Sequence, residues 1–549
     1  MRFPAETSVL VVGGGPVGLT LSLLLSGHGV PHLLVEAHPG TSHHPKARGV
    51  SARSMEILRR LGLEQAVREA GLPASHVFFY RGRTLVDPDF VRTGLVGAPD
   101  GGAERTPAPG LICPQDALEA LLLRRARELA PDGIRFGTRL VSFAESTESA
   151  ESAGGAGGDR GDGGTQGVHA LLEDRTTGER HTVRADWLVG CDGAASTVRA
   201  GAGIALEGPT GLGHFLSIRF EAPLGAVVAD RASASYFLTE PGRGGFLAVD
   251  NDRHWIYQHP YDPAHVDVAE LRADHPRLAA LVREAAGLPD LDVAVRDTQT
   301  WRLDARLADA YRRSRVLIAG DAAHVTPPTG GHGMNTGIGD ADNLAWKLAA
   351  VVHGPAGHAL LDTYQAERRP VARQVIDLSL ANSRARTSYR IDDELLLTAY
   401  YRSTAVLADD SDADAAPDSA APDRPALDPA GEHPEGGAGG RLPHRRLAGL
   451  PGAAASTLDL VGSGFTLLTS APAPDWRRQA DTAAAAGLPV TLHRLPAGTL
   501  GLPAETLGLP ADGAVLVRPD GHIAWRSPHP PTADGALRDA LRRILSVER

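Results

Sequence analysis

Cysteine and lysine are both scarce in this chain. Its 549 residues include only two cysteines, Cys113 and Cys191, too few for a disulfide framework or a cysteine-ligated zinc site. Lys46 and Lys347 are the only lysines, so arginine carries nearly all of the positive charge. Aromatic residues make up 5% of the chain, which gives weight to any segment in which they gather.

Long apolar runs and excess positive charge are also missing. No run approaches the ~18 apolar residues that a membrane-spanning helix needs. The net charge of −11 offers no basic stripe for nucleic acid. We therefore expect neither a membrane nor a nucleic-acid partner, and no metal site is predicted. The first apolar strand begins within ten residues of the N-terminus, which leaves no room for a signal peptide, so a cytoplasmic location is expected. This length predicts two or three domains.

A glycine-rich turn between two apolar segments is the strongest motif. One apolar run leads into GGGPVG, a helix is predicted after it, and a second apolar strand ends at Glu36. In such a β–turn–α–β unit Gly13 makes the sharp turn, Gly15 lets the backbone approach a pyrophosphate, and Gly18 allows close packing. Glu36 follows Gly18 by 18 residues and can accept hydrogen bonds from a ribose diol. The unit predicts a dinucleotide site and leaves open which dinucleotide binds.

Two later strand ends carry polar residues. The first leads into GCDGAASTVR, with Asp192 in an Asp-Gly turn and Arg199 on a short helix; alone, Asp-Gly is only a turn. The second leads into GDAAH, a Pro- and Gly-rich loop and a long helix predicted at about 334–352. A Gly-rich loop at a helix start makes a second anion site, and Asp321 can hold a sugar-like hydroxyl. His324 and His332 are interpreted as hydrogen-bonded scaffold.

Residues 214–305 are expected to form a separate antiparallel sheet. The aromatic residues concentrate here, and two interpretations stay open: they form the core of the sheet, or they form a platform for a flat ligand. Strands are predicted at 216–220, 234–238, 245–249, 254–258 and 293–301. The candidates for a substrate pocket are Tyr236, Phe246, Trp255, Tyr257 and Trp301.

Several loop positions have two interpretations. Lys46 and Arg48 precede a helix predicted at 51–61, either as solvated charge or as neutralising groups for a pyrophosphate. Gln115 begins another helix, where it either caps the helix or faces a ligand. The Pro/Gly-rich stretch 85–105 is irregular and is a candidate cover for a pocket. The Ser/Glu/Gly-rich insertion at 145–166 is expected to be a disordered loop tip.

The C-terminal part is expected to be a unit of its own. An acidic Ala/Pro/Gly-rich linker is predicted at 409–440. The tail after it contains no cysteine, which excludes dithiol redox chemistry. Its predicted elements are strands at 465–468, 490–492, 514–518 and 523–525 and a closing helix at 534–546.

The three motifs and their order resemble the single-component FAD-dependent aromatic hydroxylases, the flavoprotein monooxygenases with the p-hydroxybenzoate hydroxylase fold. The resemblance covers residues 8–405 and rests on GGGPVG, GCDGAASTVR and GDAAHVTPPTGGHGMNTGIGDADNLAWKL. The tail, with LDLVGSGFTLL and VLVRPDGHIAWR, is similar to the thioredoxin-like domain of the polyketide-tailoring and phenol hydroxylase branch. The implied α/β fold has a Rossmann-type FAD-binding domain at 1–213 and 306–405, an inserted mixed or antiparallel sheet domain for the substrate at 214–305, a flexible linker at 406–440, and a thioredoxin-like domain without redox cysteines at 441–549.

The resemblance implies roles at the matching positions. Glu36 and the Rossmann glycines would bind the ADP half of FAD, Arg48 and Gln115 would line the FAD, and Asp321 would hold the ribityl chain. Asp192 and Arg199 are implied near the pyrophosphate and the NAD(P)H path. Backbone N–H groups at 331–335 would contact the flavin pyrimidine; the family often has Gln at the position of His332. The implied cofactor residues are Gly13, Gly15, Gly18, Glu36, Arg48, Gln115, Asp192, Arg199, Asp321, Pro328, Gly331, Gly333, Met334 and Asn335.

The implied reaction is the hydroxylation of a phenolic polycycle of the polyketide type. NAD(P)H, with NADPH expected as the preferred donor, would reduce FAD, and oxygen would add to the reduced flavin. The resulting C4a-hydroperoxide would transfer its distal oxygen to an electron-rich ring. The implied partners are a small aromatic substrate and molecular oxygen, no catalytic base is identified, and a monomer or homodimer is expected.

Three alternatives are weighed against hydroxylation. The same flavin peroxide could insert oxygen beside a ketone in a Baeyer–Villiger reaction, and no motif separates the two outcomes. A flavin-dependent halogenase usually carries W-x-W-x-I-P, whereas Trp255-Ile256-Tyr257 lacks the second Trp and the Ile-Pro. A non-enzymatic, flavin-bound interaction protein would hold flavin that NADPH cannot reduce.

Overall fold

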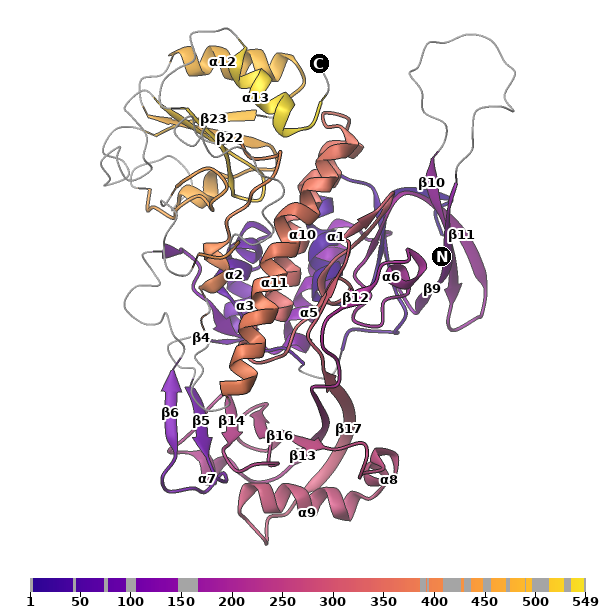
Figure 1. Ribbon diagram of the computed structural model, residues 1–549, viewed down its shortest axis with the longest axis vertical. Helices are drawn as coiled ribbons and strands as arrows, with labels where there is room; N and C mark the ends of the chain where they lie inside the picture. The colour runs from indigo at the N-terminus through magenta and orange to yellow at the C-terminus, as the bar shows by residue number, and fades with distance from the viewer. Residues whose placement is uncertain are drawn as a thin grey trace.

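The computed structural model describes residues 3–42, 46–73, 78–94, 105–146, 166–385, 392, 394–407, 426–428, 436–447, 456–470, 474–488, 490–495, 513–527 and 535–547. Three parts follow one another along the long axis of the molecule: a sheet domain at one end, a central α/β domain, and the C-terminal domain at the other end (Figure 1). The predicted α/β class with an inserted sheet domain is confirmed.

The central domain is built on an eight-stranded sheet. Five neighbouring strands run parallel in the order β20-β11-β1-β2-β8, and β19, β10 and β9 add antiparallel strands. The central strands are apolar along their length because both faces of a parallel sheet are covered, and Val9 to Val11 are fully buried. The strands are β1 (Glu6–Val12), β2 (His32–Glu36), β8 (Ile134–Phe136), β9 (Thr138–Ser146), β10 (Gly167–Asp174), β11 (Arg180–Gly190), β19 (Arg312–Arg313) and β20 (Val316–Ile318).

Helix α1 (Pro16–Gly27) contacts both α10 (Gly333–Val352) and α5 (Gln115–Leu129), and the long helix α11 (Asp362–Ala385) packs on α10 (Figure 1). The helix predicted at 51–61 is confirmed as α2 (Ala52–Arg60), and the Ser51 hydroxyl caps it by accepting from the N–H of Ser54. The shorter helices are α3 (Glu64–Glu69), α6 (Thr197–Gly201), η2 (Gly320–Ala322), η3 (His358–Leu361) and η4 (Leu395–Thr398). One small sheet has the strand order β3 (Gly49–Val50), β7 (Leu111–Ile112) and β4 (Leu72–Pro73). A second has the order β12 (Leu206–Glu207), β18 (Arg306–Ala308) and β21 (His324–Val325).

The inserted sheet has seven strands, in the order β17-β13-β16-β15-β14-β5-β6. The five strands predicted within 214–305 are present, but the sheet also contains β5 and β6 from before that range. The stretch 85–105 is therefore not irregular throughout, because β6 lies inside it. The elements are β5 (Phe78–Gly82), β6 (Val91–Gly94), β13 (Gly213–Glu221), α7 (Gly225–Val228), β14 (Ser235–Leu238), β15 (Gly245–Ala248), β16 (His254–Tyr261), α8 (Val268–Ala273), α9 (His275–Ala286) and β17 (Ala294–Leu303).

The C-terminal domain has the strand order β23-β22-β24-β25, in which β22 and β23 are parallel and the other pairs are antiparallel. This β-α-β-β-β-α pattern is that of a thioredoxin-like unit, and the predicted strands and closing helix are present. The elements are η6 (Thr457–Leu460), β22 (Phe465–Ser470), α12 (Pro474–Ala485), β23 (Val490–Leu495), β24 (Ala514–Val517), β25 (Ile523–Ser527) and α13 (Ala536–Ile544).

Two low-complexity predictions fall mainly outside the described residues. The tip of the insertion, 147–165, is one of them, and most of the linker 406–440 is the other. Described pieces of that linker are packed, however: Leu427 is 4% exposed beside Val371 and Val375, and the N–H of Gly439 donates to the carbonyl of Ile523 (2.8 Å). The flexible-linker prediction is therefore wrong for 426–428 and 436–440, because their apolar and backbone groups are bound by the neighbouring domains.

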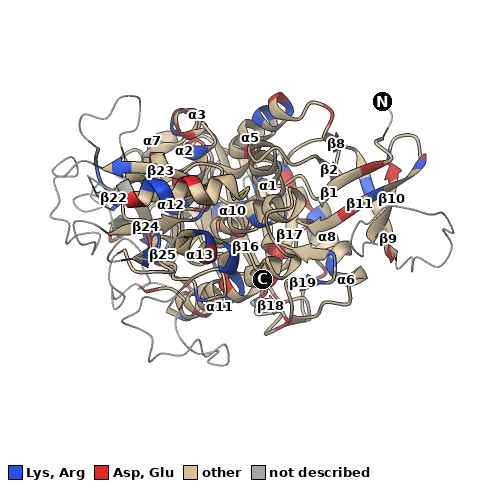
Figure 2. Ribbon diagram, turned by 90° about the horizontal axis from the view of Figure 1, so that it is seen from above, with Lys and Arg blue, Asp and Glu red and all other residues tan. Residues whose placement is uncertain are grey.

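Positive and negative residues are interspersed on the described elements, as α12 and α13 illustrate (Figure 2). None of the described helices is both long enough and apolar enough to cross a membrane.

Candidate functional site

The three sequence motifs meet at the carboxyl ends of β1, β11 and β20, which are neighbouring parallel strands. Gly13 has a φ of +112°, and a Cβ there would lie 2.3 Å from the carbonyl oxygen of Cys191. Gly320 has a φ of +62°, and a Cβ on Gly320 would lie 2.9 Å from Cγ2 of Val17. Only glycine fits these two turns. The open-sheet rule places ligands at such strand ends.

The first turn of α1 combines a crowded glycine with an open one. A Cβ on Gly18 would lie 2.0 Å from the carbonyl oxygen of Gly13, which confirms the close helix–strand packing expected there. A Cβ on Gly15 would meet no protein atom within 4 Å. The surrounding protein therefore leaves room for a side chain at position 15, although the residue is a glycine. The free N–H groups at the start of the helix lie beside this space.

The Glu36 side chain turns back over this turn. Its Oε2 accepts from the N–H of Gly14 (2.7 Å), and its Oε1 accepts from the N–H of His38 (2.8 Å). A carboxylate oxygen can accept more than one hydrogen bond, so Oε2 retains capacity for a ligand hydroxyl. The acid at the end of β2 therefore lies where the motif predicts it.

Asp321, in η2, is exposed to solvent although protein surrounds it closely. Desolvation raises the pKa of its carboxyl, and the charges of His324 and Lys46 act in the opposite direction. Lys46 itself is exposed. The carboxylate is thus held near a cationic side chain in a position that remains accessible.

A buried polar cluster around Asp340 fixes the turn that carries Asp321. Asp340 on α10 accepts from the N–H of Gly320 (3.1 Å), from His324 Nε2 (2.6 Å) and from Arg368 Nε (2.8 Å). Burial alone would raise the pKa of Asp340, but His324 and Arg368 outweigh it and hold that pKa below its usual value. The scaffold interpretation fits His324, whose ring nitrogen is committed to Asp340.

The loop before α10 presents a second open backbone. Gly331 is exposed, has a φ of +75°, and has no atom within 4 Å of its ideal Cβ position. Pro328 is exposed, whereas Gly333 and Met334 are half-buried at the helix start. Burial lowers the pKa of His332 to about 4, so its ring is neutral at pH 7.

Asn335 is buried, and its side chain makes hydrogen bonds within the protein. Its Oδ1 accepts from the Ser51 N–H (2.9 Å) and the Ser54 hydroxyl (2.8 Å), and its Nδ2 donates to the carbonyls of Gly49 (2.9 Å) and Gly331 (2.8 Å). The side chain thereby joins the start of α2 to the loop before α10.

Arg48 and Gln115 lie where the central domain meets the inserted sheet. Arg48 donates to the carbonyl of Ala234, and burial lowers its pKa to about 10. Gln115 Oε1 accepts from the Ala47 N–H (3.1 Å), and its Nε2 donates to Glu119 (2.7 Å). Gln115 therefore fastens the loop that carries Arg48 and does not cap the helix. That Gln115 faces a ligand stays a prediction.

Arg199 joins the second motif to the third, and Asp192 makes its hydrogen bonds within the second motif. Asp192 accepts from the Ser196 hydroxyl and from the N–H of Val198 (3.1 Å), which caps α6. Arg199 donates to the carbonyls of Ala322 (3.1 Å) and Ala194 (2.9 Å). Desolvation raises the pKa of Asp192 and lowers that of Arg199.

Four of the five pocket candidates prove to be core residues. Tyr236, Phe246, Trp255 and Tyr257 are at most 2% exposed and pack with Leu278 and Val282 of α9, which covers the face of the sheet away from the central domain (Figure 1). The polar atoms of the four are satisfied within this layer, for example Tyr257 by the carbonyl of Arg243 (2.6 Å). The core interpretation holds for these four because strand alternation directs them to α9.

The opposite face of the same sheet is turned towards the central domain, where Phe79 packs with Ile112 of β7. On this face Phe215 stacks on Trp301 with ring centroids 4.3 Å apart, and Gln258 Oε1 accepts from Trp301 Nε1 (2.6 Å) and the Ser217 hydroxyl (2.8 Å). Trp301 is one of the pocket candidates named from the sequence, whereas Phe215, Gln258 and Ser217 beside it are not. Their alternation with buried neighbours along β13 and β16 was the available signal.

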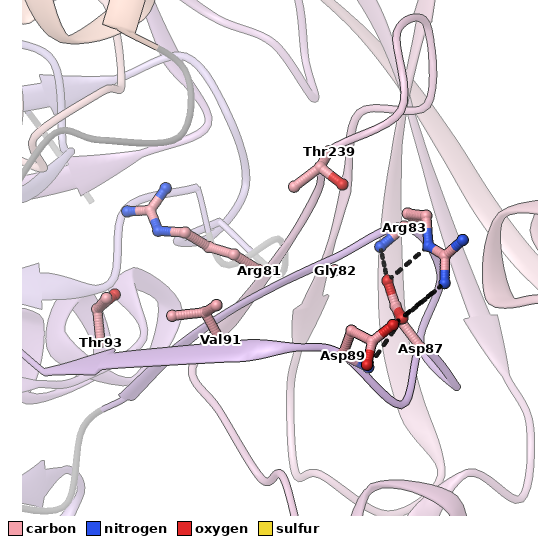
Figure 3. A pocket seen from close by; sticks show the side chains of 8 residues that line it. All are labelled: Arg81, Gly82, Arg83, Asp87, Asp89, Val91, Thr93 and Thr239. Atoms are coloured by element: carbon pink, nitrogen blue, oxygen red, sulfur yellow. Dashed lines mark hydrogen bonds and ion pairs between the residues drawn. The ribbon is translucent and has the colours of Figure 1, made fainter.

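A surface pocket of about 390 Å³ lies at the outer edge of this sheet (Figure 3). Arg83 and Asp87 form an ion pair (3.1 Å) along one side of it, and Arg81 is directed away from that pair. None of the three motifs contributes to it. The lining residues are Arg81, Gly82, Arg83, Asp87, Asp89, Val91, Thr93 and Thr239.

Comparisons with known families agree with this geometry. A family model described as FAD binding domain matches residues 6–379, and another described as aromatic-ring hydroxylase, C-terminal, matches residues 435–547. The chain belongs to the FAD-dependent aromatic hydroxylases. One chain thus carries the FAD-binding domain and the C-terminal domain described for aromatic-ring hydroxylases.

Relatives of this hydroxylase match it over almost its whole length. The tetracenomycin A2 monooxygenase-dioxygenase of Streptomyces glaucescens is 38% identical over 574 aligned residues, covering 98% of this chain and 97% of that protein. The solved structure of the flavin-dependent monooxygenase PieE in complex with FAD and substrate has a TM-score of 0.84 and 32% identity, covering 99% of both chains. A ternary complex of aklavinone-11 hydroxylase with FAD and aklavinone has a TM-score of 0.81 and 33% identity, covering 99% and 100% of the two chains.

The motif residues of this hydroxylase fit an FAD molecule. The space over Gly15 and Gly331 and the free N–H groups at the starts of α1 and α10 suit phosphate and flavin oxygens. Glu36 and Asp321 carry carboxylate oxygens, which can accept hydrogen bonds from hydroxyl groups such as those of FAD. Gly15, Glu36 and Asp321 lie at or just after the ends of parallel strands of one sheet, in which the order is β20-β11-β1-β2, and an extended dinucleotide lies along such strand ends.

Proposed function

We propose that this hydroxylase transfers one oxygen atom from O₂ to a flat, phenolic, polyketide-type polycycle, with NAD(P)H as reductant. The observation that supports this most strongly is the meeting of three FAD-type motifs opposite a sheet face that carries aromatic and amide side chains. The relatives named for tetracenomycin A2 and aklavinone support the substrate class.

Roles for the cofactor residues form part of the proposal. Glu36 would bind the adenosine ribose, the first turn of α1 the pyrophosphate, and Asp321 the ribityl chain, while the backbone at 331–335 would contact the flavin pyrimidine. Bound FAD would supply the redox chemistry by accepting hydride from NAD(P)H and then activating oxygen. Arg48 and Gln115 would position the loop between FAD and substrate, because their side chains fasten that loop to its neighbours.

The sheet face beside the central domain would hold the substrate. The stacked pair Phe215 and Trp301 offers a flat apolar surface. The indole N–H of Trp301 can only donate, so the oxygen of Gln258 must be the atom that accepts from it. The amide NH₂ of Gln258 is then left to donate elsewhere, and a ring carbonyl or phenolic oxygen of the substrate is a suitable acceptor.

Protein groups would also control water and orientation. Closure of the sheet face over the FAD site would exclude water and hold the target ring carbon near the reacting centre. We assign no base, because the described histidines nearest to the motifs are either hydrogen-bonded to a buried carboxylate, as His324 is, or buried and neutral, as His332 is.

Aerobic turnover with NADPH, NADH and a panel of phenolic and quinonoid polycycles tests the proposal. We expect bound FAD, faster flavin reduction with the right substrate, and a product heavier by one oxygen atom in the mass spectrum. NMR of the product separates ring hydroxylation from Baeyer–Villiger insertion, since the latter expands a ring to a lactone. Failure of both nicotinamide nucleotides to reduce the flavin with any compound would contradict the proposal and favour an interaction protein.

A further inference from the structure

The turn between β24 and β25 of the C-terminal domain is inserted into the central domain. Arg518 at its start is 0% exposed, and it donates to both carboxylate oxygens of Glu367 on α11, at 2.6 Å and 2.8 Å. From the other side, Arg60 on α2 donates to the carbonyl of Pro519 (2.6 Å) and Arg53 to that of Asp520 (2.6 Å). Two helices of the FAD-binding domain therefore hold this turn.

The end of the same turn contacts Tyr401. The His522 ring stacks on the Tyr401 ring with centroids 4.0 Å apart and an interplanar angle of 24°. The Tyr401 hydroxyl accepts from Arg368 Nη1 (3.0 Å), and Arg368 is the neighbour of Glu367 on α11. All three residues are at most 3% exposed.

Arg368 in turn contacts both segments that we assign to the flavin. Its Nε donates to Asp340, the residue that accepts from the N–H of Gly320 beside Asp321. Its Nη2 donates to the carbonyl of Thr336 in the first turn of α10 (2.9 Å). One guanidinium thus links the Asp321 turn, the start of α10 and, through Tyr401, the C-terminal domain.

We propose that the Arg518–His522 turn of the thioredoxin-like domain positions the flavin site, acting through Tyr401 and Arg368. The proposal rests on the assignment of the Asp321 turn and the α10 start to FAD. The groups along this path are buried and are ion-paired, hydrogen-bonded or stacked, so each has a strongly favoured arrangement, and a shift at one end disturbs the contact at the next. The domain contains no cysteine, and its connection to the site runs through the buried contacts of Tyr401 and Arg368.

The decisive variant is Tyr401→Phe, which removes the acceptor for Arg368 and keeps the ring that packs on His522. Ser403→Ala is the matched control: it also removes one hydroxyl, which donates to Glu367 (2.6 Å), but leaves the contacts of Arg368 intact. The FAD dissociation constant, the flavin reduction potential and the visible flavin spectrum are measured, together with thermal unfolding of the apoprotein. For Tyr401→Phe we expect FAD binding about tenfold weaker and a shifted potential. Ser403→Ala should match the wild type in both flavin readouts.

A second pair tests the C-terminal side of the contact. His522→Leu removes the ring that stacks on Tyr401, and His493→Leu makes the same change on β23, at the other edge of that sheet. We expect the first to shift the potential and weaken FAD binding in the same direction as Tyr401→Phe, and the second to leave both unchanged.

Two results would overturn the inference. One is wild-type FAD affinity and potential in Tyr401→Phe and His522→Leu. The other is a loss of FAD binding in all four variants that follows their thermal stability, since a purely structural contact behaves in this way. A wild-type protein that binds no FAD contradicts instead the proposed function, so the two failures are distinguishable.

Discussion

Gly15 and Gly18 belong to one turn, yet their surroundings differ in a way that a substitution can exploit. Gly18 is crowded by the protein itself, and Gly15 is not. A methyl group at Gly18 therefore collides with the fold, whereas one at Gly15 occupies the space that we assign to the pyrophosphate.

We expect Gly15→Ala to weaken FAD binding at least tenfold while the thermal stability of the apoprotein stays near the wild-type value. Gly18→Ala should lower both, since ~1–3 kcal/mol of strain is typical of an overpacked site. Gly27→Ala, at the end of the same helix and with no atom within 4 Å, is the control and should retain both properties. Flavin titration and thermal melts supply the two readouts. Equal FAD affinity in Gly15→Ala and the wild type would remove the pyrophosphate from this turn.

Gln258 permits a nearly isosteric test of substrate recognition. Gln258→Glu retains an oxygen for Ser217 and Trp301 but replaces the NH₂ donor with a second acceptor. We expect substrate binding to weaken by about 10- to 100-fold, the range for an unsatisfied polar contact, with FAD affinity unchanged. Gln65→Glu, on the exposed side of α3, is the control. Unchanged KM in Gln258→Glu would show that the substrate lies elsewhere on the sheet.

At the scale of elements, α11 and the β24–β25 turn are joined by carboxylates buried among guanidinium groups. Burial alone would raise the pKa of Glu367, but Arg518 and Lys347 outweigh it and hold that pKa well below its usual value of 4.5. Arg518 likewise holds the pKa of Asp520 low. Because the folded state binds these protons more weakly than the unfolded state, the carboxylates stabilise the fold at neutral pH.

The free energy of unfolding should accordingly fall as the pH drops below about 4.5, where unfolded carboxylates take up protons first. Neutral His332, with its pKa lowered to about 4, adds a loss of the same sign between pH 6.5 and 4. Urea unfolding between pH 7 and 3.5 measures the slope. Glu367→Gln should be less stable at pH 7 and show a shallower slope below pH 4.5. An equal slope in both proteins would exclude Glu367 as a source of the acid sensitivity.

The sequence predicted the elements well where the deciding interactions are local. The turns at Gly13 and Asp321 follow from glycine geometry and strand ends, and the five strands within 214–305 follow from alternation. The parallel pairing of β5 with β14 joins residues more than 150 positions apart, so no local pattern revealed it. The same applies to the bond from Arg518 to Glu367. Tyr236 and Phe237 show why four of the pocket candidates are core residues: alternation separates the two faces of the sheet but does not indicate which face α9 covers.

At the scale of the whole molecule, the C-terminal domain is bound to the central domain by charge as well as by apolar packing. Trp346 of α10 meets Phe465 of β22 edge-to-face, with ring centroids 5.8 Å apart. Buried Lys347 donates to Glu367 (2.8 Å), and burial lowers the pKa of its ammonium to about 8. Removing the C-terminal domain would expose this apolar surface and strip Glu367 of its guanidinium partner.

A chain ending after Leu407 should therefore fail to give a soluble, FAD-binding protein, since breaking a buried ion pair typically costs ~3–5 kcal/mol. The full-length protein should unfold in one calorimetric transition that includes both domains. Expression followed by sedimentation and flavin titration tests the first point, and scanning calorimetry the second. A soluble fragment with wild-type FAD affinity, or two well-separated transitions, would show that the domains are independent.

The two lysines noted at the outset have opposite environments, and this has a practical use. Lys347 is completely enclosed, whereas Lys46 is exposed and close enough to Asp321 to influence its carboxyl. An amine-reactive fluorophore should therefore modify one lysine side chain, at the mouth of the cofactor site, without mutagenesis. Peptide mapping after labelling, with and without FAD, would identify the modified position. Because the chain has so few lysines, a fluorophore on Lys46 would report optically whether the cofactor is bound.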